Sequence, residues 1–203
     1  MAVPAWFTDL VERELRAWLS FSSEQVEQLY AHYELLTRWN EKISLTSVEP
    51  GAEMVVRHYC ESLFLAAHLP SEPLSLADLG SGAGFPGVPV AVMKPECRVS
   101  LIESVQRKAV FLRESTRHLP NVAVIGKRAE AVTASFDWII SRAVNAKDIL
   151  RNVPRLSGRI ALLVGETRVQ ELKRSAGIAW SEPIRLPWGD RKFLVIGSVP
   201  RAT

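Results

Sequence analysis

The stretch Leu74-Ser75-Leu76-Ala77-Asp78-Leu79-Gly80-Ser81-Gly82-Ala83-Gly84-Phe85-Pro86-Gly87 decides the fold. It begins as a short apolar segment of strand type and then places four glycines within eight residues. A second apolar segment, 88–93, follows and ends before Pro95. Strand, glycine turn and helix in this order build a nucleotide site at the switch point of an open α/β sheet. The glycines allow positive φ and let a ligand approach the backbone closely.

Two kinds of ligand fit this loop. Gly82, Gly84 and Gly87 spell G-x-G-x-x-G, the dinucleotide fingerprint, in which a helix N-terminus holds a pyrophosphate. Read from Asp78, the loop is similar to the first motif of class I methyltransferases, which use S-adenosylmethionine (SAM). This acid would repel a pyrophosphate but suits the cationic methionine end of SAM, directly or through water. Glu103 ends the next apolar run, where a carboxylate can accept both ribose hydroxyls. SAM is favoured, and a dinucleotide is the alternative.

The composition indicates one folded unit without a membrane segment. The chain has 203 residues, of which 47% are hydrophobic, enough for one core with a small appendage. No apolar run approaches the roughly eighteen residues that span a bilayer, and the N-terminus lacks a signal-peptide pattern. Cys60 and Cys97 lie in different predicted elements without metal-ligand spacing, so no metal is expected. A cytoplasmic location is the simplest expectation.

The charge is divided unevenly along the chain. Residues 1–100 hold 7 Lys and Arg against 13 Asp and Glu, whereas residues 101–203 hold 18 against 9. The net charge of +3 therefore combines an acidic first half with a basic second half. Such asymmetry points to a polyanionic partner that meets the second half.

The hydrophobic pattern predicts a helical start followed by alternating strands and helices. Helices are expected over 6–19, from the capping-box pair Ser22 and Gln25 onward, and over 53–68. Further on, strands are expected at 74–79, 99–103, 122–125, 136–141, 159–164, 178–184 and 192–198, and helices at 87–93, 106–119, 147–153 and 167–175.

This pattern predicts an α/β protein with a Rossmann-like fold, the class I SAM-dependent methyltransferase fold. Seven strands with intervening helices imply a mostly parallel sheet that is covered on both faces. The loop 186–191 is too short for a helix, so the last two strands are expected to form an antiparallel hairpin. Residues 1–70 are expected to form a helical cap on a SAM-binding domain, residues 71–203, in one compact unit.

Two turns at the carboxyl ends of the strands are expected to face the ligand. The first contains Lys127, Arg128, Ala129 and Glu130, whose backbone and carboxylate could bracket an adenine ring. The second, Ser141-Arg142-Ala143, places an arginine at the same rim, where it could contact a phosphate or a base edge.

The absence of several reactive motifs from the sequence narrows the kind of atom that could accept the methyl group. No Asn-Pro-Pro-Tyr-like tetrad follows the fourth strand, neither cysteine is placed to attack a pyrimidine, and no Lys-Asp-Lys-Glu set is evident. A substrate that is already nucleophilic remains, such as guanine N7 with its free lone pair. Its methylation needs alignment with the methyl group but no general base.

Basic residues of the second half offer an RNA surface, for which strongly salt-dependent binding is expected. They are Arg107, Lys108, Arg113, Arg117, Lys127, Arg128, Arg142, Arg151, Arg155 and Arg159. In the first half, Arg57 and His58 lie one helical turn before Glu61. The His58 and Glu61 pair could be an acid/base couple or a surface ion pair.

Five motifs in a fixed order carry a resemblance to a known family. They are residues 39–47 (Trp-Asn-Glu-Lys-Ile-Ser-Leu-Thr-Ser), Arg57-His58 with Glu61-Ser62, residues 78–89, Glu103-Ser104 with Arg107-Lys108 and Phe111-Leu112, and residues 136–143. Together they resemble the bacterial small-subunit (16S) rRNA guanine-N7 methyltransferase G family, also called glucose-inhibited division protein B. The likeness covers nearly the whole chain.

The resemblance implies a monomeric, cytoplasmic enzyme that methylates N7 of one guanine in 16S rRNA, free or in the small ribosomal subunit. It implies SAM as cofactor. By motif, Gly80 and Phe85 would contact SAM, Glu103 the ribose, and Ala129 and Glu130 the adenine. Arg142 would stand at the methyl-transfer crevice as the catalytic, positioning residue. The full expected sets are Asp78, Gly80, Gly82, Gly84, Phe85, Glu103, Ala129, Glu130 and Arg142 for the cofactor, and Arg57, His58, Arg107, Lys108, Lys127 and Arg128 for RNA.

Three positions depart from the family pattern. The family usually shows Asn-Leu-Thr where this chain has Ser44-Leu45-Thr46, and Asp-Ser where it has Glu61-Ser62. A Lys-Gly after the fifth strand is replaced by Val164-Gly165. A cation near the transfer site could hold RNA, so a SAM-binding protein with altered or lost rRNA activity is the alternative function.

Overall fold

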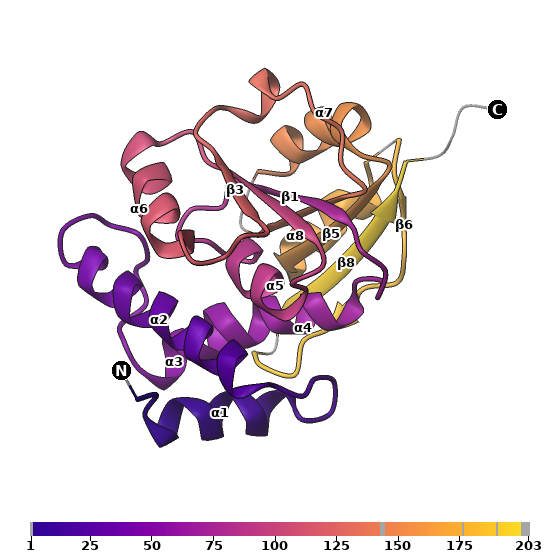
Figure 1. Cartoon of the computed structure of the whole chain (residues 1–203). Coiled ribbons are helices and arrows are strands. Elements are labelled where there is room, and N and C mark those ends of the chain that lie inside the picture. Colours follow the sequence, from indigo (N-terminus) through magenta and orange to yellow (C-terminus); the bar gives the residue numbers. More distant parts are fainter. Residues whose placement is uncertain (1, 143–144, 176, 190, 200–203) are drawn as a thin grey trace.

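The apolar segments after residue 74 form one sheet in the computed structural model, which describes residues 2–142, 145–175, 177–189 and 191–199 (Figure 1). Its order is β3-β2-β1-β4-β5-β8-β6, and β7 also pairs with β8. The pairs among β1 to β5 are parallel, whereas β8 runs antiparallel to β5, β6 and β7. The strands are β1 Ser75–Leu79, β2 Arg98–Ile102, β3 Val122–Ile125, β4 Trp138–Arg142, β5 Arg159–Gly165, β6 Ala179–Trp180, β7 Ile184–Arg185 and β8 Lys192–Ser198.

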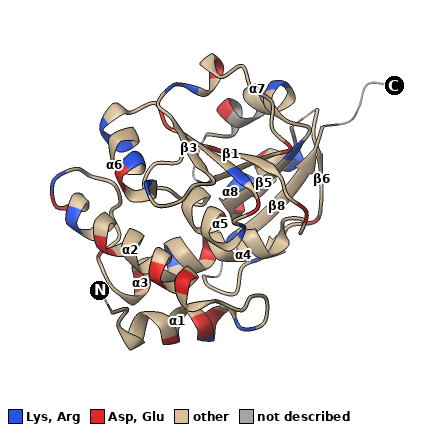
Figure 2. Cartoon of the chain, viewed as in Figure 1, with Lys and Arg blue, Asp and Glu red and all other residues tan. Residues whose placement is uncertain are grey.

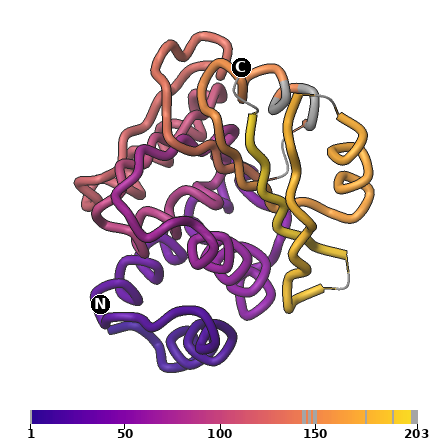
Figure 3. Tube along the Cα trace, turned by 90° about the vertical axis from the view of Figure 1, so that its right-hand side faces the viewer, coloured from indigo at the N-terminus to yellow at the C-terminus, as the bar shows by residue number. Residues whose placement is uncertain are grey.

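Helices cover both faces of this sheet because successive strand residues point to opposite sides. On one face, Leu76, Leu101 and Leu163 pack against α5 (Gly87–Met93) and α6 (Gln106–Thr116). On the other, Ala77, Ile139 and Leu162 form a separate core with α7 (Ala146–Leu156) and α8 (Glu166–Lys173). The indigo N-terminal helices and the orange C-terminal ones accordingly lie on different sides of the trace (Figures 1 and 3).

The helical start packs on the α5 and α6 side. It consists of α1 (Ala5–Leu15), α2 (Ser23–Asn40), α3 (Ala52–Met54), a π-helical segment η1 (Val55–Cys60) and α4 (Glu61–His68). Phe7, Leu29, Tyr59 and Leu63 are fully buried and belong to the same hydrophobic cluster as Leu76 of β1. The predicted capping box is present: the Ser22 hydroxyl accepts from Gln25 N, and the Gln25 side chain accepts from Ser22 N. Such a cap stabilises a helix by about 1 kcal/mol.

The predicted fold class is confirmed, and two details of it were wrong. The sixth expected strand is two short strands, β6 and β7, so that three residues, 181–183, oppose two residues, 195–196, of β8. Pro183 has no N–H for the ladder, which interrupts the pairing there. The expected third helix is wound as a π-helix through Val55–Cys60. Of the predicted Ser141-Arg142-Ala143 turn, Ala143 lies outside the described residues.

The charge division of the sequence is visible in the fold. Acidic positions gather on α1 to α3, whereas α6 carries a run of basic ones (Figure 2). Within the described ranges, no helix has both the length and the apolar character that crossing a membrane would require.

Candidate functional site

The glycine loop leaves β1 at the point where the strand order reverses between β1 and β4. Gly80 N and Ser81 N both donate to Ile102 O, at distances of 2.9 and 3.1 Å, which ties the start of the loop to the end of β2. Gly80 has φ 70° and Gly82 has φ 57°, values that glycine adopts without a steric penalty. Both residues line cavities, in agreement with their predicted place at a ligand.

Asp78 lies beneath the loop and lines neither of these cavities, and its expected contact with the ligand, directly or through water, stays a prediction. Its side chain is fully buried, and its Oδ2 accepts from Gly87 N at 2.9 Å. Burial raises the pKa of this carboxyl to about 7, and the Gly87 N–H opposes that shift. Asp78 therefore holds the start of α5 against β1 and shapes the loop from below.

The last two glycines also face the protein interior. A Cβ on Gly84 would lie 2.7 Å from Val88 Cγ2 and 3.0 Å from His32 Nε2. A Cβ on Gly87 would lie 2.6 Å from Asp78 Oδ2 and would collide with Leu101. The glycine at position 84 thus serves close packing, and its predicted cofactor contact stays a prediction.

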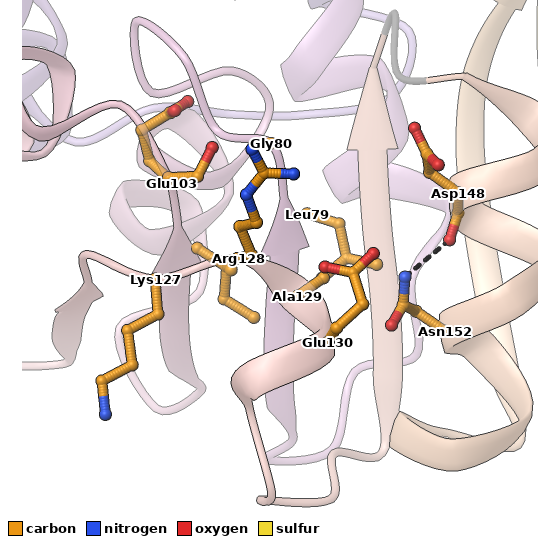
Figure 4. A pocket seen from close by; sticks show the side chains of 11 residues that line it. Leu79, Gly80, Glu103, Lys127, Arg128, Ala129, Glu130, Asp148 and Asn152 are labelled. Atoms are coloured by element: carbon orange, nitrogen blue, oxygen red, sulfur yellow. Dashed lines mark hydrogen bonds between the residues drawn. The ribbon is translucent and has the colours of Figure 1, made fainter.

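Glu103 dominates a cavity of about 200 Å³ at the ends of β1, β2 and β3, called here the Glu103 cavity. Its Oε2 accepts from Gly82 N at 2.9 Å and its Oε1 accepts from Val105 N at 2.7 Å. Each oxygen keeps a second lone pair for a hydroxyl group. The cavity is lined by Leu79, Gly80, Ile102, Glu103, Ser104, Lys127, Arg128, Ala129, Glu130, Asp148 and Asn152 (Figure 4).

Four of the predicted residues after β3 meet in this one cavity. Ala129 and Glu130 belong to a 3-10 turn, η2 (Ala129–Ala131), and lie across the cavity from Glu103. Lys127 and Arg128, predicted for RNA, also line it. The Arg128 side chain runs toward Gly80, whereas Lys127 points away from the other labelled residues (Figure 4). The structure thus brings Arg128 to the same cavity as the predicted cofactor residues.

A second cavity of about 260 Å³ adjoins the first at Gly80 and is called here the central cavity. It is lined by Leu45, Thr46, His58, Gly80, Ser81, Gly82, Ala83, Phe85 and Arg142. The predicted residues Phe85, His58 and Arg142 therefore meet here. The rings of His58 and Phe85 contact each other in a tilted arrangement, with centroids 4.8 Å apart and an interplanar angle of 30°.

A chain of hydrogen bonds crosses the central cavity and fixes the tautomer of His58. Arg142 Nη1 lies 2.9 Å from His58 Nδ1, and His58 Nε2 lies 2.7 Å from Thr46 Oγ1. A guanidinium can only donate, so Nδ1 accepts and the ring proton resides on Nε2, which donates to Thr46. Burial, aided by the Arg142 charge, lowers the pKa of His58 to about 3, so the ring is neutral.

Thr46 completes the chain. Its Oγ1 also accepts from Val48 N at 3.1 Å, so both acceptor positions of the hydroxyl are filled. Among the described residues, nothing accepts the hydroxyl proton of Thr46. The proton is therefore available to a ligand in the central cavity.

Glu61 pairs with Arg142 and not with His58. Arg142 Nη2 lies 3.5 Å from Glu61 Oε2, and the two side chains are 13% and 3% exposed. Burial raises the pKa of Glu61 and lowers that of Arg142, while each partner's charge opposes the shift of the other. The two readings of the His58 and Glu61 pair, an acid/base couple or a surface ion pair, are both wrong, because the residues are buried and joined through Arg142.

A third cavity, of about 480 Å³, adjoins the second at Arg142 and is called here the basic cavity. The predicted RNA residue Arg57 lines it, while Arg107 and Lys108 lie outside the three cavities on the first turn of α6. Arg57 Nη1 donates to Glu53 Oε1 at 2.9 Å. The cavity is lined by Arg57, Arg142, Leu163, Val164, Gly165, Thr167, Arg168, Glu171 and Lys192.

Several site residues escaped prediction because their signal lies outside the strand ends. Thr46 and Glu61 stood only within motifs of the resemblance, and Lys192 follows a loop without a motif. His32, which no motif marks, is fully buried under the glycine loop with its Nδ1 2.7 Å from Tyr59 Oη. Burial lowers the pKa of His32 to about 3. In the part of the chain that the structure describes, no cluster of His, Cys, Asp and Glu could hold a metal ion.

Comparison with protein families supports the resemblance read from the motifs. The family model described as rRNA small subunit methyltransferase G matches residues 25–181. The chain is 32% identical to "Ribosomal RNA small subunit methyltransferase G" of Roseiflexus sp. (strain RS-1), over 93% of this chain and 89% of that protein. It is 31% identical to the protein of the same name from Enterobacter sp. (strain 638), over 89% and 93%.

Solved structures agree in fold. A SAM dependent methyltransferase from Aquifex aeolicus superposes with a TM-score of 0.61 at 16% identity, covering 72% of this chain and 93% of that chain. The fibrillarin pre-rRNA processing protein of Methanococcus jannaschii gives a TM-score of 0.55 at 15% identity, covering 64% and 69%. At this identity the likeness establishes the shared fold alone.

Proposed function

The chain belongs to the rRNA small subunit methyltransferase G family, and on this premise we propose that it methylates N7 of a guanine in 16S rRNA with SAM as cofactor. The observation that carries the proposal is the junction of two cavities at Gly80. One cavity ends in a carboxylate suited to ribose, and the other holds hydrogen-bond donors around an imidazole whose two nitrogens are both engaged.

The residues present fit SAM. We propose that Glu103 accepts from the ribose hydroxyls, because each of its oxygens is held by one backbone N–H and keeps a free lone pair. Ala129 and Glu130 flank the adenine, and Gly80, Gly82 and Phe85 line the path toward the methyl group. When bound, SAM supplies an electrophilic methyl group that a guanine N7 lone pair can take without loss of a proton.

The central cavity contributes position and charge to this reaction. Its single imidazole, His58, is neutral and donates its proton to Thr46, so it does not serve as a general base there. Arg142, held by His58 and Glu61, is the positioning residue at the crevice. Rigid donors of this kind stabilise charge that changes during reaction because they need no reorganisation.

Guanine is the base that suits these donors. Its Hoogsteen edge carries two acceptors, N7 and O6, whereas adenine presents an N6 amino donor in place of O6. The free Thr46 proton and the guanidinium of Arg142 could donate to O6 but would oppose an amino group. Thr46→Val should therefore lower kcat/KM for the RNA by about tenfold or more, and Thr46→Ser should retain it.

We also propose that the two parts of the chain have different roles. Residues 1–70 form the cap and residues 71–203 the SAM-binding part, and they fold as one unit because they share a hydrophobic cluster. Residues 71–203 expressed alone should expose that cluster and fail to unfold cooperatively. The protein acts as a monomer in the cytoplasm.

The direct test uses small ribosomal subunits and naked 16S rRNA from a strain that lacks the enzyme. Each is incubated with the protein and methyl-labelled SAM, and the digested nucleosides are identified by mass spectrometry. Labelled 7-methylguanosine in one oligonucleotide is the expected result. SAM binding by calorimetry without a labelled nucleoside would instead favour the SAM-binding protein. The dinucleotide alternative is set aside by the family match.

A further inference from the structure

The basic cavity next to the transfer site has a larger excess of cationic side chains than the two other cavities. Four cationic side chains line it, from Arg57, Arg142, Arg168 and Lys192, against one lining carboxylate, Glu171. It opens beside Arg142, which also lines the central cavity. A substrate strand whose guanine enters the central cavity must place the adjoining backbone near this edge.

We propose that the basic cavity is a phosphodiester subsite for the substrate RNA strand, and that Lys192 is its determining cation. This inference rests on the proposed function. Phosphate groups prefer guanidinium and ammonium donors, and several cations around one pocket attract an anion more strongly than separate surface charges do.

Lys192 differs from its three neighbours because its side chain has no partner among the described residues. Arg57 pairs with Glu53 and Arg168 with Glu171, each at 2.9 Å, and Arg142 pairs with Glu61. The Lys192 ammonium group makes no hydrogen bond or ion pair with any residue in the described ranges. Its charge is felt by the buried Glu61 carboxyl, whose pKa it lowers together with Arg142 and Arg57, against the larger effect of burial. Its ammonium group is thus close to the Arg142 pair and available to an anion.

The sheet holds Lys192 in place. It is the first residue of β8 and pairs with Gly165, the last residue of β5. Leu186 N donates to Lys192 O at 3.0 Å, and the loop before it is anchored where Trp188 Nε1 donates to Glu14 Oε2 at 2.7 Å. Since residues directly opposite in an antiparallel pair share a face, Lys192 points to the side that Gly165 leaves open.

This placement bears on the departure at position 164. The family pattern has a lysine there, and this chain has Val164, which also lines the basic cavity. The neighbouring antiparallel strand delivers Lys192 to the same cavity. The basic cavity of this chain thus keeps a lysine, although Val164 and Lys192 point to opposite faces of the sheet.

The test measures RNA binding without turnover. Unmodified 16S rRNA and an unrelated RNA of equal length are each titrated with protein in the presence of S-adenosylhomocysteine, across a series of salt concentrations. Wild type is compared with Lys192→Ala, Lys192→Arg and a control, Lys173→Ala, whose lysine does not line the basic cavity and pairs with Glu182. Thermal unfolding and SAM calorimetry confirm that all variants fold and bind cofactor alike.

Lys192→Ala is expected to weaken binding of both RNAs about tenfold and to reduce the salt slope by about 1, because one phosphate contact is lost. Lys192→Arg and Lys173→Ala should stay within about twofold of wild type. Unchanged affinity and slope in Lys192→Ala would overturn the subsite. A loss confined to 16S rRNA would overturn it as well, because it would indicate a base contact. Wild type that binds neither RNA would instead remove the proposed function.

Discussion

The Glu103 cavity and the central cavity share Gly80, yet they are built from different kinds of contact. Around Glu103 the carboxylate is held by backbone N–H groups of Gly82 and Val105, which lie 21 and 2 residues away. In the central cavity the side chains hold one another, and Arg142 reaches His58 across 84 residues. A cofactor pocket can therefore rest on local backbone geometry, whereas the transfer site depends on the whole fold.

Of the substitutions predicted here, loss of Arg142 is expected to have the largest effect on the central cavity. Arg142→Ala leaves Glu61 buried without a partner, which typically costs about 3–5 kcal/mol of stability. We expect methyl transfer to fall below detection in the mass-spectrometric assay, with a smaller loss of SAM affinity by calorimetry. The double variant Arg142→Met with Glu61→Leu should unfold at a higher denaturant concentration than Arg142→Ala. Equal destabilisation would show that the ion pair is not what holds this cavity together.

A substitution at Gly87 tests the packing of α5 beneath the Glu103 cavity. Gly87→Ala places a Cβ 2.6 Å from Asp78 Oδ2 and against Leu101, and such overpacking costs about 1–3 kcal/mol. Denaturant unfolding should show this loss, and SAM affinity should fall with it. Gly158→Ala is the matched control, because a Cβ there meets nothing within 4 Å. A Gly87→Ala protein as stable as the control would contradict the packing described for α5.

A substitution at Glu103 is expected to weaken SAM binding and to leave the methyl-transfer step nearly unchanged. Glu103→Gln removes the charged acceptor, and hydrogen bonds to charged groups contribute about 1.5–3 kcal/mol. SAM affinity should drop roughly ten- to hundredfold in calorimetry, while kcat at saturating SAM changes little. Glu130→Gln, at an exposed position of the same cavity, should change affinity less than about threefold. If both variants lose affinity equally, the ribose is not held at Glu103 in particular.

The pH dependence of stability offers the smallest and most specific effect. The pKa of Asp78 is raised to about 7, above its ordinary value, so the folded state holds a proton that the unfolded state releases. Stability from this group is present at low pH and is lost as pH rises toward 7, with a slope of up to about 1.4 kcal/mol per pH unit. Asp78→Asn should lack this component.

The comparison must use the difference between wild type and variant. His32 and His58 have lowered pKa values, so they contribute in the opposite direction, losing stability as pH falls below about 6.5. Unfolding curves between pH 5 and pH 7 provide the check, taken at about half-unit steps. Parallel curves for wild type and Asp78→Asn would mean that the carboxyl titrates alike in both states.

Sequence patterns anticipated the fold well where they are local. The glycine loop, the capping box at Ser22 and the alternating strands were found where expected, because each depends on a few neighbouring residues. The π-helical turn Val55–Cys60 and the interruption at Pro183 were missed, since helical periodicity and strand propensity alone do not reveal them. In the site, Gly80, Gly82, Phe85 and Glu103 lie at cavities as predicted, while Asp78 and Gly84 face inward.

The sequence by itself determined the succession of strands and helices in the cofactor half, the loop that a nucleotide can approach and the carboxylate at the end of β2. These follow from backbone geometry and from the rule that parallel strands end at one edge. Only the tertiary structure decided the neutral tautomer of His58, the pairing of Glu61 with Arg142 and the place of Lys192 in the basic cavity. Those depend on burial and on contacts between distant segments, which no short stretch of residues encodes.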